Sequence, residues 1–143
     1  MVHYTSLNAP YLLYQPMNLN QVTVSALDIA ASIAFYKKLG LELIVSSPHY
    51  ARFKCPAGEA TFSVHLVQDI QPPSSTVVYF ETASLDAKVK QLQDAGLLFM
   101  HEPRDESWLW REARLADPTG NVICLYWAGD NRLNPPWRVI AAQ

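Results

Sequence analysis

The sequence has few of the features that mark a membrane, secreted or nucleic-acid-binding protein. No apolar run approaches the roughly 18 residues that a membrane-spanning helix needs, so we expect no membrane contact. The N-terminus has no basic segment followed by an apolar core, so we expect no signal peptide. The formal net charge is −2, which argues against the basic surface that nucleic-acid binding requires.

Cysteine is also scarce, with only Cys55 and Cys124 among the 143 residues. Both lie in segments that we predict to be strands, where buried free thiols are the usual state, and this fits a reducing cytoplasm. A disulfide between Cys55 and Cys124 is the alternative. The sequence also has no CxxC pair, no glycine-rich phosphate loop and no Ser/His/Asp set.

The composition instead indicates a globular protein with a packed core. Half of the residues are hydrophobic, 11% are aromatic and 17% are charged, which is not the composition of a disordered chain. The length suits one domain or two small modules packed tightly together.

One order of elements, a strand, a helix and then three strands, occurs twice along the chain. In each half an N-cap residue (Asp28 or Ser84) begins the predicted helix, and a glycine (Gly40 or Gly96) ends it. The two glycines lie 56 residues apart, and the same offset relates Val77 to Gln21, which indicates a duplication. The predicted strands cover residues 21–26, 41–46, 50–55 and 61–67 in the first half, and 77–82, 97–100, 111–116 and 122–126 in the second.

Proline-rich segments divide the chain and follow its last strand. The pair at residues 72 and 73 cannot continue a strand or helix, so we place a linker at residues 69–75. The other predicted parts are an N-terminal extension (1–19), a first βαβββ module (20–68), a second βαβββ module (76–127) and a C-terminal tail (128–143). Trp137 is predicted to anchor that tail on the domain or on a second subunit.

The last two predicted strands are joined by the turn sequence DPTGN at residues 117–121. Pro118 presets the first turn dihedral, Asp117 can bond its own backbone, and Gly120 accepts a positive φ. By itself this pattern is also that of an ordinary hairpin.

Together with the two βαβββ units and the FYKKLGLEL segment at residues 35–43, the DPTGN turn resembles the vicinal-oxygen-chelate superfamily. That superfamily includes glyoxalase I, bleomycin-resistance proteins and extradiol dioxygenases, and the resemblance covers residues 19–127. It implies an α+β fold in which two βαβββ modules form a cupped mixed sheet, with the active site on the concave face. Relatives commonly complete their cups by pairing modules, so the resemblance also implies a homodimer.

The resemblance places metal ligands at Gln21, His65, Val77 and Cys124. Valine cannot bind a metal, and a cysteine thiolate suits zinc or copper rather than an octahedral, oxygen-rich site. Gln21 and His65 remain as an incomplete metal site, so the cofactor is either none or a divalent metal ion. An iron dioxygenase of the usual kind is excluded, because its ligand set is not kept.

Other residues are predicted to line or border the cup. Glu81 shares a strand face with Val77 and Tyr79, so it could act with His65 as a catalytic base or as a ligand; the alternative is a solvent-exposed rim residue. Trp108 and Trp110 near Arg111 could form an aromatic wall with a cationic end for a flat or anionic molecule, or a lid packed on the domain. The further candidates for ligand binding are Gln21, Arg52, Tyr79, Cys124 and Tyr126.

Three functions follow, in the order that the sequence favours them. The first is a glyoxalase/bleomycin-resistance-like protein that binds a small organic molecule in its cup without the usual complete metal site, for sequestration or as an enzyme. The second is a metal-dependent lyase or isomerase of glyoxalase type, in which metal coordination stabilises an enediolate. The third is a non-catalytic dimerising module.

Overall fold

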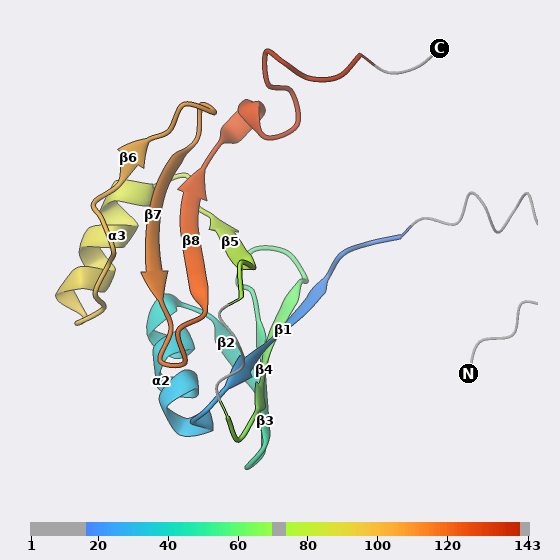
Figure 1. Ribbon diagram of the computed structural model, residues 1–143, viewed down its shortest axis with the longest axis vertical. Helices are drawn as coiled ribbons and strands as arrows, with labels where there is room; N and C mark the ends of the chain where they lie inside the picture. Colours follow the sequence, from blue (N-terminus) through green and yellow to red (C-terminus); the bar gives the residue numbers. More distant parts are fainter. Residues whose placement is uncertain (1–16, 70–73, 141–143) are drawn as a thin grey trace, which may run out of the picture.

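The computed structural model describes residues 17–69 and 74–140, and in it the predicted strand–helix–three-strand order occurs twice (Figure 1). Most of the predicted N-terminal extension and linker lies outside the described residues. The first module consists of β1 (Gln21–Ala26), α2 (Ile29–Leu39), β2 (Glu42–Ser46), β3 (Tyr50–Lys54) and β4 (Thr61–Leu66). The second consists of β5 (Val77–Glu81), α3 (Leu85–Asp94), β6 (Arg104–Asp105), β7 (Arg111–Ala116) and β8 (Val122–Trp127).

Each module forms one four-stranded mixed sheet with the same topology. The first sheet has the order β1-β4-β3-β2 and the second sheet has the order β5-β8-β7-β6. In each, the strand before the helix runs parallel to the last strand, and the remaining neighbours are antiparallel. The α+β fold with two βαβββ modules is therefore confirmed.

The predicted signals at the ends of α2 are confirmed. Asp28 Oδ1 accepts a hydrogen bond from the backbone N–H of Ala31 at 2.9 Å, which satisfies a donor of the first turn. Gly40 has a φ of 114° and ends the helix in the left-handed conformation. Ser84 also lies at the N-cap position of α3, but its side chain makes no capping hydrogen bond.

The prediction of a strand at residues 97–100 is wrong. Only Phe99 pairs there, in an isolated bridge with Leu115, and the strand that borders β7 is the two-residue β6, which lies between the predicted strands at 97–100 and 111–116. Between these two pairings the register shifts by two residues, around Pro103. Proline has no backbone N–H to donate, so it interrupts a ladder that an unbroken segment would continue.

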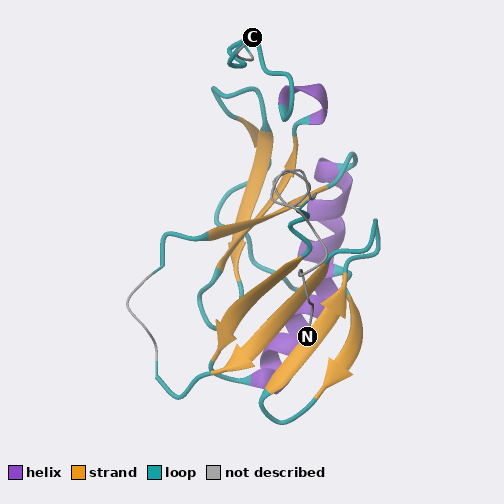
Figure 2. Ribbon diagram, turned by 90° about the vertical axis from the view of Figure 1, so that its right-hand side faces the viewer, coloured by secondary structure: helices purple, strands orange, loops and turns teal. Residues whose placement is uncertain are grey.

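Both sheets turn one face toward the helices, and these faces share one hydrophobic core. Apolar residues of every strand except the short, exposed β6 enter this core, and in most of these strands they alternate, as expected for a sheet with one covered face. The ring centroids of Phe62 in β4 and Phe80 in β5 lie 5.8 Å apart, which brings the two sheets into contact. In Figure 2 the helices lie alongside the strands, one beyond the other. No helix of the described ranges is long and apolar enough to cross a membrane.

The DPTGN turn joins the second module to the first. Asp117 is buried and accepts four hydrogen bonds, from the Tyr36 hydroxyl at 2.6 Å, from the backbone N–H groups of Thr119 and Asn121 at 2.9 Å, and from Asn121 Nδ2 at 2.8 Å. Asn121 Nδ2 also donates to the Ser25 carbonyl at 2.8 Å, and Thr119 Oγ1 accepts from Leu27 N at 3.0 Å. Burial and the adjacent Asp117 carboxylate raise the pKa of Tyr36, which therefore stays a neutral donor.

We predict that this junction contributes strongly to stability. Tyr36→Phe removes one hydrogen bond to a buried carboxylate and should lower the free energy of unfolding by about 1.5–3 kcal/mol. Asp117→Ala removes four acceptor contacts at once and should cost more than ~3 kcal/mol. Urea unfolding measures both changes. Tyr79→Phe, at a tyrosine that is 42% exposed, is the matched control and should change stability by less than ~1 kcal/mol. Equal effects of the two Tyr→Phe changes would contradict the prediction.

Candidate functional site

The open face of the second sheet, the face away from the helices, carries an unusual set of side chains for a strand surface. Core residues alternate along β5, β7 and β8, so the residues between them point to the other side. The residues on this open face are Val77, Tyr79, Glu81, Glu112, Arg114, Cys124 and Tyr126.

Three aromatic rings meet on this face, and we call Tyr79, Trp110 and Tyr126 the aromatic corner. The rings of Trp110 and Tyr126 are stacked, with centroids 4.7 Å apart and planes at 22°. Tyr79 stands edge-on to both, at 5.9 Å from Trp110 and 5.5 Å from Tyr126. Tyr126 is 7% exposed and Tyr79 is 42% exposed, so the corner has a covered base and an accessible side. Such geometry is favourable for aromatic pairs and leaves ring surface for a further flat group.

A buried carboxylate lies beside the aromatic corner. Glu112 is 2% exposed, and its Oε2 accepts a hydrogen bond from Trp108 Nε1 at 2.7 Å. Its Oε1 accepts one from Arg114 Nη2 at 3.4 Å, and the same nitrogen donates to the Tyr79 hydroxyl at 3.1 Å. Tryptophan, glutamate, arginine and tyrosine thus form one connected network. A buried charge is tolerated when it is paired and hydrogen-bonded in this way.

Sequence analysis did not select Glu112 or Arg114. The available signal was the alternation of β7, in which Ala113 and Leu115 are the apolar residues and Glu112 and Arg114 lie between them. This alternation places the glutamate and the arginine side by side on the face of the strand that is not covered by the core, and it could have identified them as candidate site residues.

Arg111 points to the opposite side of β7 from its neighbour Glu112. Its Nε and Nη2 bind the two oxygens of Asp86 in α3 at 2.9 and 3.0 Å, and its Nη1 binds Asp105 in β6 at 3.1 Å. These pairs keep its pKa high and tie α3 to the strands. The structure thus separates Arg111 from Trp108 and Trp110, and the cationic end of the aromatic wall is Arg114.

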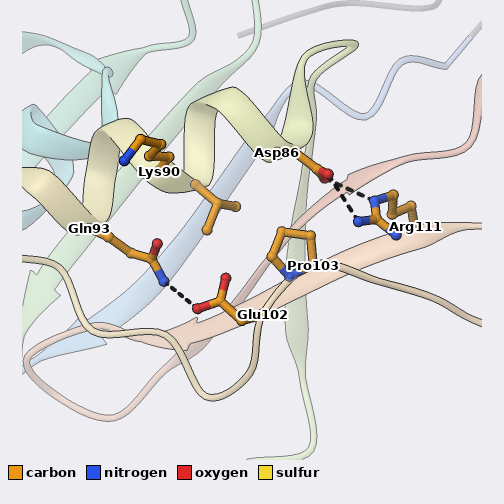
Figure 3. A pocket seen from close by; sticks show the side chains of 7 residues that line it. Asp86, Lys90, Gln93, Glu102, Pro103 and Arg111 are labelled. Atoms are coloured by element: carbon orange, nitrogen blue, oxygen red, sulfur yellow. Dashed lines mark hydrogen bonds and ion pairs between the residues drawn. The ribbon is translucent and has the colours of Figure 1, made fainter.

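Arg111 lines a shallow hollow of about 350 Å³ on the helix side of the second sheet. Figure 3 shows its ion pair with Asp86 at one end and the hydrogen bond from Gln93 to Glu102, 3.0 Å long, at the other. Three of its four charged side chains, those of Asp86, Glu102 and Arg111, already have partners, so this hollow is a weaker candidate for a binding site than the open face.

Glu81 fastens the start of the C-terminal tail. Its Oε2 accepts hydrogen bonds from the backbone N–H groups of Ala128 at 3.0 Å and Gly129 at 3.2 Å, and its Oε1 lies 3.8 Å from Arg132 Nε. The tail then forms the short helix η1 (Gly129–Asn131). Glu81 and His65, the two predicted catalytic residues, lie in different sheets, and no hydrogen bond connects them within the described ranges.

Cys124 is fully buried beneath this network. Burial, followed by the charge of Glu112, raises the pKa of its thiol to about 12. The free thiol is therefore protonated at neutral pH. As a soft ligand it would suit zinc or copper rather than an octahedral, oxygen-rich site.

The open face of the first sheet is mainly polar, and Tyr50 is the tyrosine it carries. Gln21 Nε2 donates to Ser63 Oγ at 2.7 Å, and the Tyr50 hydroxyl and Ser63 Oγ are 2.6 Å apart. Arg52 Nε donates to the Tyr50 hydroxyl at 2.9 Å. The hydrogen bond with Ser63 lowers the pKa of Tyr50 despite a small opposing effect of burial. His65 is exposed on the same face.

The residues at the family's metal positions do not fit a divalent ion. Val77 has no donor atom, Cys124 is a fully buried, soft thiol, and Gln21 is hydrogen-bonded to Ser63. Among the described residues no three His, Cys, Asp or Glu side chains are grouped as metal ligands would be. His65 is the one good ligand at these positions, and a single imidazole does not make a structural or catalytic metal site.

The fold and the position of the site define the class of protein. Paired βαβββ modules with a DPTGN hairpin are the architecture of the vicinal-oxygen-chelate fold, as the sequence predicted. The chain belongs to the Glyoxalase/Bleomycin resistance protein/Dioxygenase superfamily, whose family model matches residues 18–125.

Individual relatives agree with this assignment. An uncharacterised protein of Mycolicibacterium smegmatis is 30% identical over 106 residues, covering 73% of this chain and 89% of its own. A glyoxalase/bleomycin resistance protein/dioxygenase from Nocardioides superposes with a TM-score of 0.69 at 22% identity, over 88% of this chain and 91% of that one. A bleomycin-binding protein solved in complex with bleomycin has a TM-score of 0.66 at 16% identity, over 78% and 98% of the two chains. The two solved structures support the fold alone.

The environments of the two cysteines predict different reactivity. Cys55 is partly exposed and Cys124 is buried, and both are free in the structure. With a pKa of about 12, only about one Cys124 thiol in ten thousand is ionised at pH 8. Iodoacetamide should therefore modify Cys55 first in the native protein, and Cys124 only after unfolding in urea. Mass spectrometry of peptides at successive times measures both rates, and equal native rates would contradict the described burial of Cys124.

Proposed function

We propose that this protein binds a small organic molecule on the open face of the second sheet, against the aromatic corner, without a complete metal site. The observation that carries the proposal is the aromatic corner beside the Glu112–Arg114 pair. A sheet face that only stabilised the fold would need neither a buried carboxylate nor an accessible arginine, since each costs desolvation free energy.

The exposed rings support a ligand rather than a completed core. Tyr79 and Trp108 are each 42% exposed, so the described chain leaves them partly uncovered. Covering roughly 100 Å² of aromatic surface would contribute about 2.5 kcal/mol, or roughly a 60-fold gain in affinity. The fold gains no stability from the ring surface that stays in water, whereas a small molecule that covers this surface would gain that binding free energy.

The relatives support the proposal at the level of the fold. A protein with this fold was solved in complex with bleomycin, so the architecture is compatible with holding an organic molecule. Its ligand is not carried over to this chain, because identity is 16%. A metal-dependent lyase or isomerase is the weaker candidate, because Val77 has no donor atom, the Cys124 thiol is soft and fully buried, and the Glu81 carboxylate is hydrogen-bonded to the tail.

We predict that small aromatic compounds bind at the aromatic corner. A fragment screen read by the indole N–H signals of the four tryptophans should find compounds that shift Trp108 and Trp110 but not Trp127 and Trp137. Tyr79→Ala should weaken those compounds by about tenfold, because it removes an exposed ring wall. Leu98→Ala, at a side chain that is 87% exposed on another part of the surface, is the control. Compounds that shift all four indoles alike, or none that bind, would refute the proposal.

We also propose that the chain forms a homodimer in which the tail takes part. Leu133, Trp137, Val139 and Ile140 are 62, 58, 85 and 88% exposed, and one short segment rarely leaves so much apolar surface in water without a partner. The start of this tail is fastened by Glu81, which would hold it ready for a second copy.

The tail prediction is tested by sedimentation. The 16.1 kDa chain should sediment as a dimer of twice that mass, and a Trp137→Ser/Val139→Ser variant should shift toward the monomer. Met100→Ser replaces an apolar side chain that is 55% exposed elsewhere and should leave the dimer intact. A wild-type monomer at micromolar concentration would overturn the homodimer, and an unshifted variant would overturn the role of the tail.

A further inference from the structure

We infer that the molecule bound at this site is a flat organic anion, in chemical class an aromatic carboxylate, and that Arg114 is the residue that selects its charge. This inference rests on the proposed ligand-binding function and adds the substrate class and the specificity residue. Four observations carry it: the accessible charge, the unused donors, the fixed position of the guanidinium, and the contrast with the first sheet.

The charged group that keeps free hydrogen-bonding capacity on the open face of the second sheet is Arg114. Glu112 is 2% exposed, and both of its oxygens already accept hydrogen bonds from Trp108 and Arg114. The Glu81 side chain is 29% exposed, but its Oε2 accepts hydrogen bonds from two backbone N–H groups of the tail and its Oε1 lies 3.8 Å from Arg132 Nε. The Arg114 side chain is 30% exposed. A cationic ligand would meet carboxylates that already have partners and would be repelled by the arginine, whereas an anion would meet an accessible guanidinium.

Arg114 also has hydrogen-bond donors that the described residues do not use. A guanidinium has five N–H groups, and in Arg114 the two described hydrogen bonds, to Tyr79 and Glu112, are both made by Nη2. Its Nε and Nη1 make no hydrogen bond to any residue in the described ranges. Carboxylates are the acceptors that form the strongest hydrogen bonds with such donors.

The position of this guanidinium is fixed before a ligand arrives. Glu112 is held by Trp108, and Arg114 is held in turn by Glu112 and by the Tyr79 hydroxyl. The guanidinium carbon lies 5.8 Å from the centroid of the Tyr79 ring. Glu112 is thus a positioning residue. The exposed rings of Tyr79 and Trp108 are connected to the Arg114 guanidinium through these hydrogen bonds. A flat body with an attached carboxylate matches rings and charge together, and preorganisation lowers the entropic cost of binding it.

The first sheet has an arginine at the equivalent position, but a single tyrosine ring lies beside it instead of three aromatic rings: the guanidinium carbon of Arg52 is 5.4 Å from the centroid of Tyr50. Arg52 pairs with Ser63 as Arg114 pairs with Cys124, and Thr23 lies opposite Ser63 where Tyr79 lies opposite Cys124. Both open faces therefore carry an arginine at the equivalent position, and only the second face combines this arginine with the aromatic corner. This contrast assigns flat anions to the second sheet.

The test uses three naphthalenes that differ only in charge: 2-naphthoate, 2-naphthamide and 2-naphthylmethylammonium. Their dissociation constants are measured by the indole N–H shifts of Trp108 and Trp110 at low salt. Wild-type protein should bind 2-naphthoate about tenfold or more tightly than 2-naphthamide, with the ammonium compound weakest. Arg114→Gln should reduce the preference for the carboxylate to within about threefold, while Arg114→Lys, which keeps the charge and loses the planar fork, should fall between.

Arg111→Gln is the matched control, because it removes an arginine from the same strand but from the opposite face. It should lower stability through the lost ion pairs with Asp86 and Asp105, and it should keep the full preference for 2-naphthoate. The dispersion of the indole signals confirms that each variant remains folded.

The outcomes separate this inference from the proposed function. If 2-naphthamide or the ammonium compound binds wild type as tightly as 2-naphthoate, or if Arg114→Gln keeps the tenfold preference, the anion selectivity is wrong while ligand binding at the aromatic corner stands. If none of the three compounds binds, the assigned ligand class is wrong, and the fragment screen decides the proposed function independently. A preference that Arg111→Gln abolishes and Arg114→Gln keeps would assign the selection to the other face.

Discussion

The structure depends on a single buried carboxylate, that of Asp117, which accepts four hydrogen bonds at the junction of the two modules. Two of these come from the backbone of its own turn and therefore fix the conformation between β7 and β8. A third comes from Tyr36 in the other module, so the same carboxylate that shapes the hairpin also holds it against α2. Because β7 and β8 carry Glu112, Arg114, Cys124 and Tyr126 in strict register, the chemistry of the open face follows from the geometry of this turn.

The period of two along β7 then decides what each charged residue does. Arg111 and Glu112 are neighbours in sequence, yet one makes an ion pair with Asp86 on the helix side and the other forms the buried anion of the open face. Glu112 is tolerated in its buried position because an indole and a guanidinium donate to it. In return it holds both donors in place. The contacts that stabilise this face are thus also those on which the proposed recognition depends, and a change at Glu112 would affect both.

Much of this architecture could be predicted from the sequence, because its signals are local. The caps of α2, the positive-φ glycine after it and the DPTGN turn depend on residues close in the chain, and the repeated element order revealed the two modules. The strand expected at residues 97–100 was wrong because Pro103 breaks the ladder beside β7, and the pairing there depends on a partner segment. The face of Arg111 could not be assigned for a related reason: a shift of one residue in the strand places a side chain on the opposite side of the sheet. The role of Glu81 was beyond local reasoning, since its hydrogen-bond partners lie 47 and 48 residues away in the tail.

The residues that replace the family's metal ligands also shape the site proposed for this chain. Valine at residue 77 and a buried thiol at residue 124 take coordinating groups away from the open face, and they also make its floor apolar. An apolar floor lowers the local dielectric constant, and this strengthens the electrostatic interactions of any charge that remains accessible above it. Here that charge is Arg114, paired below with a carboxylate that solvent does not reach. A face built in the family for a metal cation would be converted in this way, by few substitutions, into one whose exposed charge is itself cationic, and its ligand would be selected by an organic guanidinium instead of a metal ion.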